Sequence, residues 1–154
     1  MISLSKVSLK DITDAAENAY PRECCGLLAG YTDETGGRLI TRVVLSRNLS
    51  SGDTRDSFEV DPEVRFSLMR NLEQADKGEI IVGHYHSHPN CSPTPSSRDL
   101  AMAYEPNLVW VIVAIHSGVV TETRAYMISV DTSTFNEIPL RILDNLPYRV
   151  SKET

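Results

Sequence analysis

The chain contains the stretch Ile80-Ile81-Val82-Gly83-His84-Tyr85-His86-Ser87-His88-Pro89, in which an apolar run leads into three of its four histidines. The apolar part predicts a buried strand. Side chains two residues apart on a strand share a face, so His84, His86 and His88 are expected to point the same way. A strand rises about 3.3 Å per residue, which separates His84 from His88 by about 13 Å. One metal ion can therefore be held by an adjacent pair of these histidines, but not by all three.

A carboxylate follows the histidines after a short loop. Residues 89–95 contain three prolines and predict a loop, and residues 96–104 predict a short helix with Asp99 in its first turn. An H-x-H pair plus a carboxylate, with water in the fourth position, is a sound ligand set for catalytic zinc. Ser96-Ser97-Arg98-Asp99 also matches a helix capping box, so Asp99 could cap the helix, bind a metal, or do both. The alternative for the histidines is a polar strand end with ordinary hydrogen bonds.

A metal-activated water also needs a proton acceptor, and a carboxylate near the metal suits that task. The glutamates considered for this role are Glu23, Glu59, Glu63 and Glu105. Glu23 immediately precedes Cys24-Cys25-Gly26-Leu27-Leu28, which leads into a short apolar strand. A glutamate beside a buried strand is favoured to lie near the interior. The alternative is a solvated loop glutamate.

Composition limits the class of protein. The length of 154 residues predicts a single domain over residues 1–154, with a core over about 1–130 and a C-terminal extension over 139–154. Apolar residues make up 41% and charged residues 23%, as in soluble globular proteins. The net charge of −6 argues against a general nucleic-acid or anionic-membrane binder. No apolar run approaches the ~20 residues of a membrane span, and the N-terminus has no signal-peptide pattern, so we expect a cytoplasmic protein.

The three cysteines, Cys24, Cys25 and Cys91, are odd in number and form no disulfide framework, which fits a reducing compartment. Neither C-x-x-C nor H-E-x-x-H occurs in the chain. Cys25 is expected to be a small buried hydrophobe. Cys24 adjoins Glu23, and Cys91 lies between the ligand candidates. Either could act as a redox or inhibitory thiol near a metal; the alternative is that neither touches it.

The order of elements predicts an α/β fold, a mixed β-sheet with helices packed against it. Helices are expected at 9–19 with Ser8 as N-cap, from Asp61 to about 76 with Gly78 closing it, and at 96–104. Polar residues 46–57 predict a mobile surface loop. Strands are expected at 2–5, at the apolar run ending at 30, and at 38–45, 58–60, 80–86, 108–115, 123–130 and 135–143.

These motifs together resemble a known family. His86-Ser87-His88, then seven residues, then Ser96-Ser97-Arg98-Asp99, is similar to the JAMM (MPN+) metallopeptidase motif H-[ST]-H-x7-S-x2-D. The upstream Pro-x-Glu-x-Cys-Gly-Leu-Leu-x-Gly resembles the segment that carries the family's glutamate. Phe58-x-Val60-Asp61-Pro62 resembles its strand-to-helix step. The resemblance covers about residues 1–130, without gaps in the spacing.

The resemblance implies a cytidine-deaminase-like JAMM/MPN fold and a role for each matching residue. His86, His88 and Asp99 would bind one Zn²⁺ per chain, with water as the fourth ligand. Glu23 would be the general acid/base, and Ser96 would hydrogen-bond the oxyanion. Members that lack one of these residues are non-catalytic scaffolds, whereas this chain has the full set. His84 matches no functional position and is expected to be structural or to support the ligands.

The resemblance further implies hydrolysis of a peptide or isopeptide bond after the C-terminal Gly-Gly of a ubiquitin-like sulfur-carrier protein. The tail is expected to add as a strand along a groove beside the zinc, with residues 46–57 as one wall. The alternative of another class is a non-catalytic MPN-type interaction module. A zinc deaminase is disfavoured because the P-C-x-x-C ligand pair is absent. A metal-sensing or storage protein would have no use for the extra carboxylate and hydroxyl.

Overall fold

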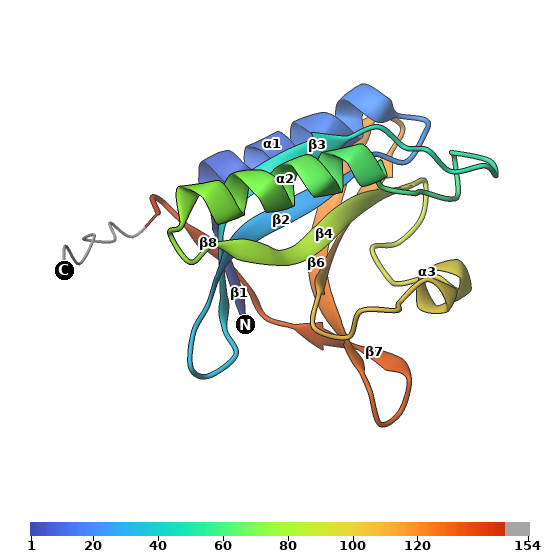
Figure 1. The fold of residues 1–154 in the computed structure, drawn as a ribbon. Coiled ribbons are helices and arrows are strands. Elements are labelled where there is room, and N and C mark those ends of the chain that lie inside the picture. The colour runs from blue at the N-terminus through green and yellow to red at the C-terminus, as the bar shows by residue number, and fades with distance from the viewer. Residues whose placement is uncertain (147–154) are drawn as a thin grey trace.

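A mixed sheet of eight strands forms the centre of the computed structural model, which describes residues 1–146 (Figure 1). The strands are β1 (Ile2–Ser5), β2 (Cys25–Thr32), β3 (Arg38–Ser46), β4 (Ile80–Pro89), β5 (Val109–His116), β6 (Val119–Ser129), β7 (Thr134–Ile138) and β8 (Leu140–Leu143). Their order in the sheet is β7-β6-β5-β4-β2-β3-β1-β8. The histidine strand β4 is therefore internal, antiparallel to β2 and parallel to β5.

Helices cover both faces of this sheet. They are α1 (Lys6–Ala19), α2 (Pro62–Ala75) and the short α3 (Ser97–Ala101). Helix α1 packs its buried Ile12 against the face that carries Leu28, whereas α2 packs Leu68 against the face that carries Leu27. Because neighbouring strand residues point to opposite faces, α1 and α2 lie on opposite sides. Because helices cover both faces of the sheet, side chains on both faces of β4 and β5 are buried, and both strands begin as nearly continuous apolar runs.

The helix predictions hold, with shifted ends. Helix α1 begins at Lys6 rather than residue 9, because Ser5, the last residue of β1, accepts a hydrogen bond from the Ser8 backbone N–H at 3.1 Å. Ser8 is thus a buried helical residue instead of the predicted cap. Asp61 caps α2 as predicted, accepting from the Glu63 N–H at 2.9 Å. That helix ends at Ala75, and its C-cap is Asp76, two residues before Gly78, with a left-handed φ of 49°.

Two strand predictions are wrong. Residues 58–60 form no strand and make only an isolated bridge between Val60 and Asn48. The predicted strand at 135–143 is instead two strands, β7 and β8, at opposite edges of the sheet. Pro139 lies between them, and a proline has no N–H to continue a ladder. Helix α3 is shorter than predicted, β4 runs on to Pro89, and β6 starts at Val119. The last part of the predicted C-terminal extension, residues 147–154, lies outside the described residues.

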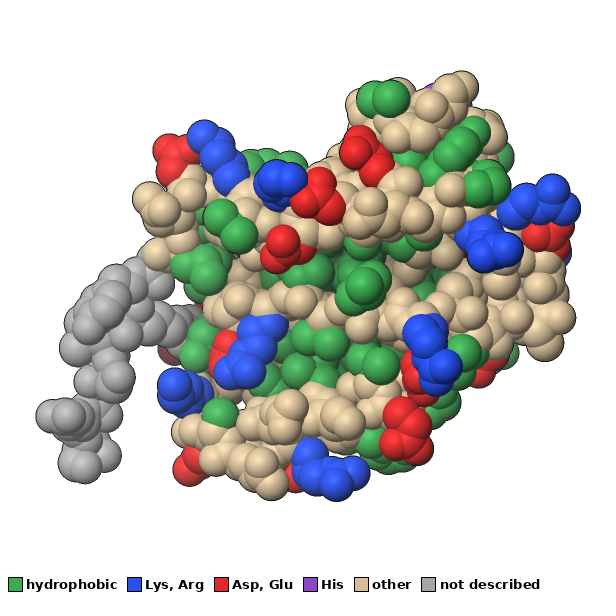
Figure 2. Space-filling model, turned by 90° about the horizontal axis from the view of Figure 1, so that it is seen from above, with side chains coloured by type: hydrophobic (Ala, Val, Ile, Leu, Met, Phe, Trp, Pro, Cys, Tyr) green, Lys and Arg blue, Asp and Glu red, His purple; other side chains and the backbone are tan. Residues whose placement is uncertain are grey.

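Apolar side chains are exposed around β3. Seen from above, hydrophobic side chains gather in a central band along β3 between α1 and α2, with charged side chains around it (Figure 2). Leu45 is 63% exposed there, and β1 pairs only with Arg38 and Leu39 of β3. The rest of this β3 edge has no partner strand within residues 1–146. In the same part of the chain, no helix combines the length and hydropathy that a membrane span requires.

Candidate metal centre

Three ligand-type side chains meet at the end of β4. His86 and His88 come from the strand, and Asp99 comes from α3. The two Nε2 atoms lie 3.0 Å apart, and the Asp99 carboxylate lies 3.3 Å from His86 Nε2 through Oδ1 and 3.2 Å from His88 Nε2 through Oδ2. All three side chains are buried. These residues are therefore positioned to bind a metal ion.

The chemistry of this donor set fits a cation. His88 Nδ1 lies 2.9 Å from the Ser92 carbonyl oxygen, which can only accept, so Nδ1 carries the proton and Nε2 presents its lone pair. Burial opposes ionisation of Asp99, but the two imidazoles hold the pKa of its carboxyl well below the usual range. Two imidazole nitrogens and one carboxylate oxygen are a ligand set that zinc would accept.

Asp99 serves two purposes at once. Its Oδ2 accepts a hydrogen bond from the Ser96 N–H at 2.8 Å, and the Ser96 hydroxyl accepts one from the Asp99 N–H at 3.0 Å. This is the predicted capping box. Its Oδ1 remains directed at His86. The capping hydrogen bonds thus hold the carboxylate in the orientation that faces the histidines, so the cap is compatible with a ligand role for Asp99.

Aromatic packing fixes the His86 ring. Phe58 stacks on it with centroids 4.2 Å apart and an interplanar angle of 17°, and Trp110 approaches edge-on at 5.8 Å. His86 is fully buried as a result. This contact could not be predicted from the sequence, where the pattern around Phe58 indicates a strand rather than a loop segment that stacks on His86.

Glu23 lies beside the group because of strand register. Cys25 of β2 pairs with His86 of β4, and the Ser87 N–H donates to the Cys24 carbonyl at 3.2 Å; extending this register brings Glu23 toward His88, with which it interacts electrostatically. Opposite residues in an antiparallel pair share a face. Glu23 is only 6% exposed, and its Oε2 is buried without a hydrogen-bond partner among the described residues. Burial raises the pKa of Glu23 to about 8, against the opposing effect of His88.

Two polar side chains that sequence inspection overlooked hold the Glu23 backbone in place. The fully buried Ser87 hydroxyl accepts a hydrogen bond from the Cys24 N–H at 2.8 Å. Asn48 donates to the carbonyls of Glu23 and Ser57 and accepts from the backbone of Ser50 and Glu59. Asn48 thereby ties both ends of the 46–57 loop to Glu23; the predicted mobility of that loop stays a prediction.

The remaining candidates lie elsewhere. Glu105 forms a bidentate ion pair with Arg65, and Glu59 and Glu63 are exposed. His84 shares the face of His86, as predicted, but lies outside the three-residue group. Within residues 1–146 that group contains no cysteine. Cys24 and Cys25 are buried, and burial raises their pKa to about 11 and about 12, so both stay protonated thiols; Cys91 is exposed.

The Glu23 carboxyl makes the stability of the metal-free protein depend on pH. Its folded pKa of about 8 lies above the ordinary 4.5, so its contribution is intact below pH 4.5 and is lost as pH rises through 8. The metal-free Glu23→Gln variant is therefore expected to match the wild type near pH 4.5 and to exceed it by up to a few kcal/mol above pH 8. Denaturant unfolding across this range measures the difference, with exposed Glu73→Gln as control. A difference that does not change with pH would contradict it.

A histidine pair and an aspartate converging on one point, with a buried carboxylate opposite, form a site of the kind found in metal-dependent hydrolases. The family described as prokaryotic homologs of the JAB domain matches residues 5–129, and the chain belongs to this family. The chain is 36% identical to a desampylase of Haloferax volcanii over 104 residues, which cover 68% of this chain and 70% of the relative. It is 29% identical to a CysO-cysteine peptidase of Mycobacterium tuberculosis over 129 residues, covering 84% and 82%.

Solved structures give the same fold. A protein from Desulfitobacterium hafniense superposes with a TM-score of 0.81 at 26% identity, over 95% of each chain. A JAB1/MPN domain protein from Archaeoglobus fulgidus superposes with a TM-score of 0.58 at 21% identity, over 93% of this chain and 97% of that one. The mixed sheet is thus a JAB1/MPN-type α/β fold, and the chain is a JAMM-type hydrolase.

Proposed function

We propose that the protein is a zinc-dependent peptidase that cleaves a peptide or isopeptide bond after the C-terminal Gly-Gly of a ubiquitin-like sulfur-carrier protein. The observation that carries the proposal is the convergence of His86, His88 and Asp99 beside the buried carboxylate of Glu23. The names of two relatives, desampylase and CysO-cysteine peptidase, support the substrate class.

His86, His88 and Asp99 would hold the ion, through two imidazole nitrogens and one carboxylate. At such a centre Zn²⁺ supplies Lewis acidity, which activates water at neutral pH and polarises the scissile carbonyl. The hydrogen bond from His88 Nδ1 to the Ser92 carbonyl keeps the His88 ring in the ligating tautomer. The Ser96 N–H does the same for the orientation of the Asp99 carboxylate.

Glu23 would transfer the protons. An acceptor works best when its pKa lies near the working pH, and burial moves the pKa of Glu23 toward that range. The unpartnered Oε2 is free to accept a proton from the attacking water. The same carboxyl would then give that proton to the departing amine, so that the group returns to its starting state. The backbone hydrogen bonds from Asn48 and to Thr54 hold the Glu23 main chain at this place.

Ser96 would stabilise the oxyanion. Its hydroxyl oxygen is already occupied as an acceptor by the Asp99 N–H, which leaves the hydroxyl hydrogen free to donate. Ser96 is exposed at the start of α3, next to the candidate ligands, where a substrate carbonyl could reach it. A hydrogen bond that strengthens as the carbonyl oxygen becomes negative lowers the barrier selectively.

Replacement of Ser96 separates this role from helix capping. Ser96→Ala is expected to lower kcat by about 10²–10³-fold, because one oxyanion donor is lost. Loss of the cap should also cost about 1 kcal/mol of stability. Single-turnover cleavage and denaturant unfolding measure the two effects. Ser97→Ala, at the exposed neighbouring position, is the control; equal kcat values for both variants would contradict the role of Ser96.

The 46–57 loop would form one wall of the substrate groove. It is joined to α3 by the ion pair between Arg98 and Asp56 at 2.8 Å, and to Glu23 through the hydrogen bond to Thr54 at 2.7 Å. These contacts bring the loop beside both the general acid/base candidate and the helix that bears Asp99. A narrow passage between such walls would select glycine, because any side chain there would collide with them.

The deciding experiment incubates the zinc-loaded protein with ubiquitin-like carriers extended beyond Gly-Gly, with and without a chelator. The expected result is release of a carrier that ends in Gly-Gly, lost on chelation and regained when zinc is added back. Carriers ending in Ala-Ala before the extension are the control and should resist cleavage. Binding of carriers without any cleavage would instead favour the non-catalytic interaction module. Cleavage that persists after complete removal of metal would overturn the mechanism.

A further inference from the structure

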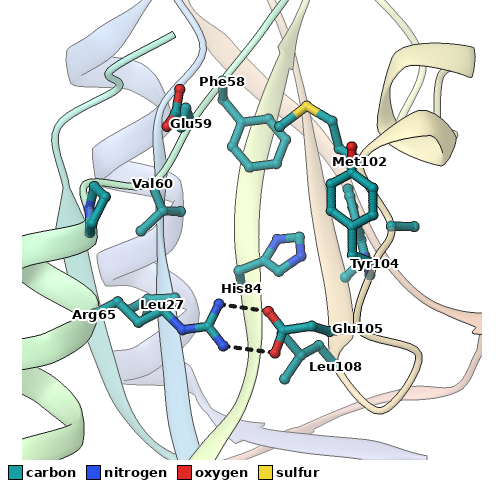
Figure 3. Close-up of a pocket in the computed structure, with 13 residues that line it drawn as sticks. Leu27, Phe58, Glu59, Val60, Arg65, His84, Met102, Tyr104, Glu105 and Leu108 are labelled. Carbon is teal, nitrogen blue, oxygen red and sulfur yellow. Dashed lines mark hydrogen bonds and ion pairs between the residues drawn. The ribbon is translucent and has the colours of Figure 1, made fainter.

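A pocket of about 280 Å³ lies beside the candidate metal centre (Figure 3). Its lining is mostly apolar and includes Leu27, Met102 and Trp110. Phe58 connects the pocket to the metal centre, because the ring that lines the pocket also stacks on His86. None of these residues takes part in the chemistry proposed above. The pocket is nevertheless separated from His86 by a single aromatic ring, that of Phe58.

His84 is a polar group in this apolar lining. Figure 3 shows its ring projecting into the pocket, below Phe58. An imidazole always carries an N–H donor, yet the ring makes no hydrogen bond to any of residues 1–146, and its Nδ1 is buried without a partner. Buried polar groups are normally paired, since leaving one unpaired costs free energy. Because Nδ1 is shielded from the pocket as well, an occupant with a hydrogen-bonding group would pair with Nε2, the ring nitrogen that is not buried.

The end of the pocket away from Phe58 is closed by an ion pair. Arg65 of α2 binds Glu105 through two hydrogen bonds of 2.6 and 2.7 Å, and Figure 3 shows this pair crossing the pocket below His84. The two charges satisfy each other, so this end offers no free charge to a ligand. A pocket of about 280 Å³ that this pair crosses suits a single side chain better than a continuing main chain. The fitting occupant is therefore one neutral side chain.

We propose that this pocket binds a side chain of the substrate tail, at the third or fourth residue before the scissile bond, and that tyrosine fits it best. The proposal rests on the proposed function. The rings of His84 and His86 are 6.5 Å apart, the length of about two residues of extended chain. If glycines occupy the first two positions at the metal, the next residues of the tail lie over His84. A tyrosine places its ring between the apolar walls and its hydroxyl at the imidazole.

Cleavage of tails with guest residues tests the pocket. Glycine, phenylalanine or tyrosine is placed at the third or the fourth position before the bond, and kcat/KM is measured with zinc-loaded protein. At one of the two positions, tyrosine is expected to exceed glycine by about tenfold or more. His84→Phe should erase the advantage of tyrosine over phenylalanine while the zinc content stays unchanged.

A matched pair of variants controls for general damage. Ala103→Leu fills the pocket and should bring the tyrosine-to-glycine ratio close to one, whereas Ala101→Leu, on the exposed end of α3, should preserve it. Chelator-sensitive cleavage that is equal for all guests would overturn the pocket assignment and leave the proposed function standing. A second series carries the same guests at the first position after the bond; an effect of Ala103→Leu on this series alone would overturn the pocket assignment too, by assigning the pocket to the leaving group.

If no tail is cleaved, that result would count against the proposed function alone. The pocket can then still be tested by measuring peptide binding. Trp110 lines the pocket and is the only tryptophan of the chain, so its fluorescence reports occupancy. Peptides that end in Gly-Gly are titrated with selective excitation of tryptophan. A saturable change, with about tenfold tighter binding for the tyrosine guest and loss in Ala103→Leu, is expected. Equal affinity for glycine and tyrosine guests would overturn the proposal.

Discussion

Glu23→Gln is expected to retain zinc and to lose cleavage by about 10²–10⁴-fold, the range that a positioned general base contributes. Glutamine has nearly the shape of a protonated glutamate and can form the same backbone hydrogen bonds. It cannot accept a proton from water. Because Glu23 is not among the three clustered ligand candidates, metal content should be unaffected. Single-turnover cleavage of an extended carrier, together with zinc analysis of the same preparation, measures both properties.

Glu63→Gln is the matched control for this experiment. Glu63 was one of the four glutamates that residue type allowed, and it lies exposed in the first turn of α2. Its replacement should leave cleavage and zinc content unchanged. If Glu23→Gln cleaved at the wild-type rate, another group would have to move the proton. If both variants were equally inactive, the loss would not identify Glu23 as that group.

The local part of the site could be predicted from sequence because it depends on short-range geometry. The period of two along a strand places His86 and His88 on one face, and S-x-x-D predicts the helix start that orients Asp99. Both rules act within about 14 residues of chain. They needed no knowledge of which strands pair, and both expectations about local structure are confirmed.

The parts of the site and fold that sequence alone does not determine depend on long-range pairing. Glu23 reaches His88 only because β2 and β4 are antiparallel with Cys25 opposite His86, and one sequence does not reveal that register. The same limit explains the error at 135–143, where a short break at Pro139 sends two strands to opposite edges of the sheet. Phe58 and Asn48 act through contacts with residues far along the chain. Their local sequence pattern therefore predicts only an ordinary strand and an ordinary loop, and does not reveal these contacts.

The choice of histidines can be tested by comparing two alanine variants. His88→Ala removes one of three clustered ligand candidates. Losing only the hydrogen-bond partner of a metal ligand typically weakens metal binding by about 10–100-fold. Loss of the ligand candidate itself should weaken zinc binding by well over that factor. His84→Ala should keep about one zinc per chain, because His84 lies one strand repeat away from the group. The two substitutions are chemically identical and lie on the same face of β4, so each is the control for the other. Zinc analysis after dialysis measures the difference.

Thermal unfolding gives a second measure of the same comparison. A ligand that binds only the folded state stabilises it, by about 4 kcal/mol at a thousandfold excess over Kd. Chelation should therefore lower the Tm of the wild type and of His84→Ala, and leave the Tm of His88→Ala unchanged. Equal zinc loss from the two variants would show that His84 belongs to the metal site. In that case the 3.0 Å approach of the His86 and His88 Nε2 atoms would need another explanation.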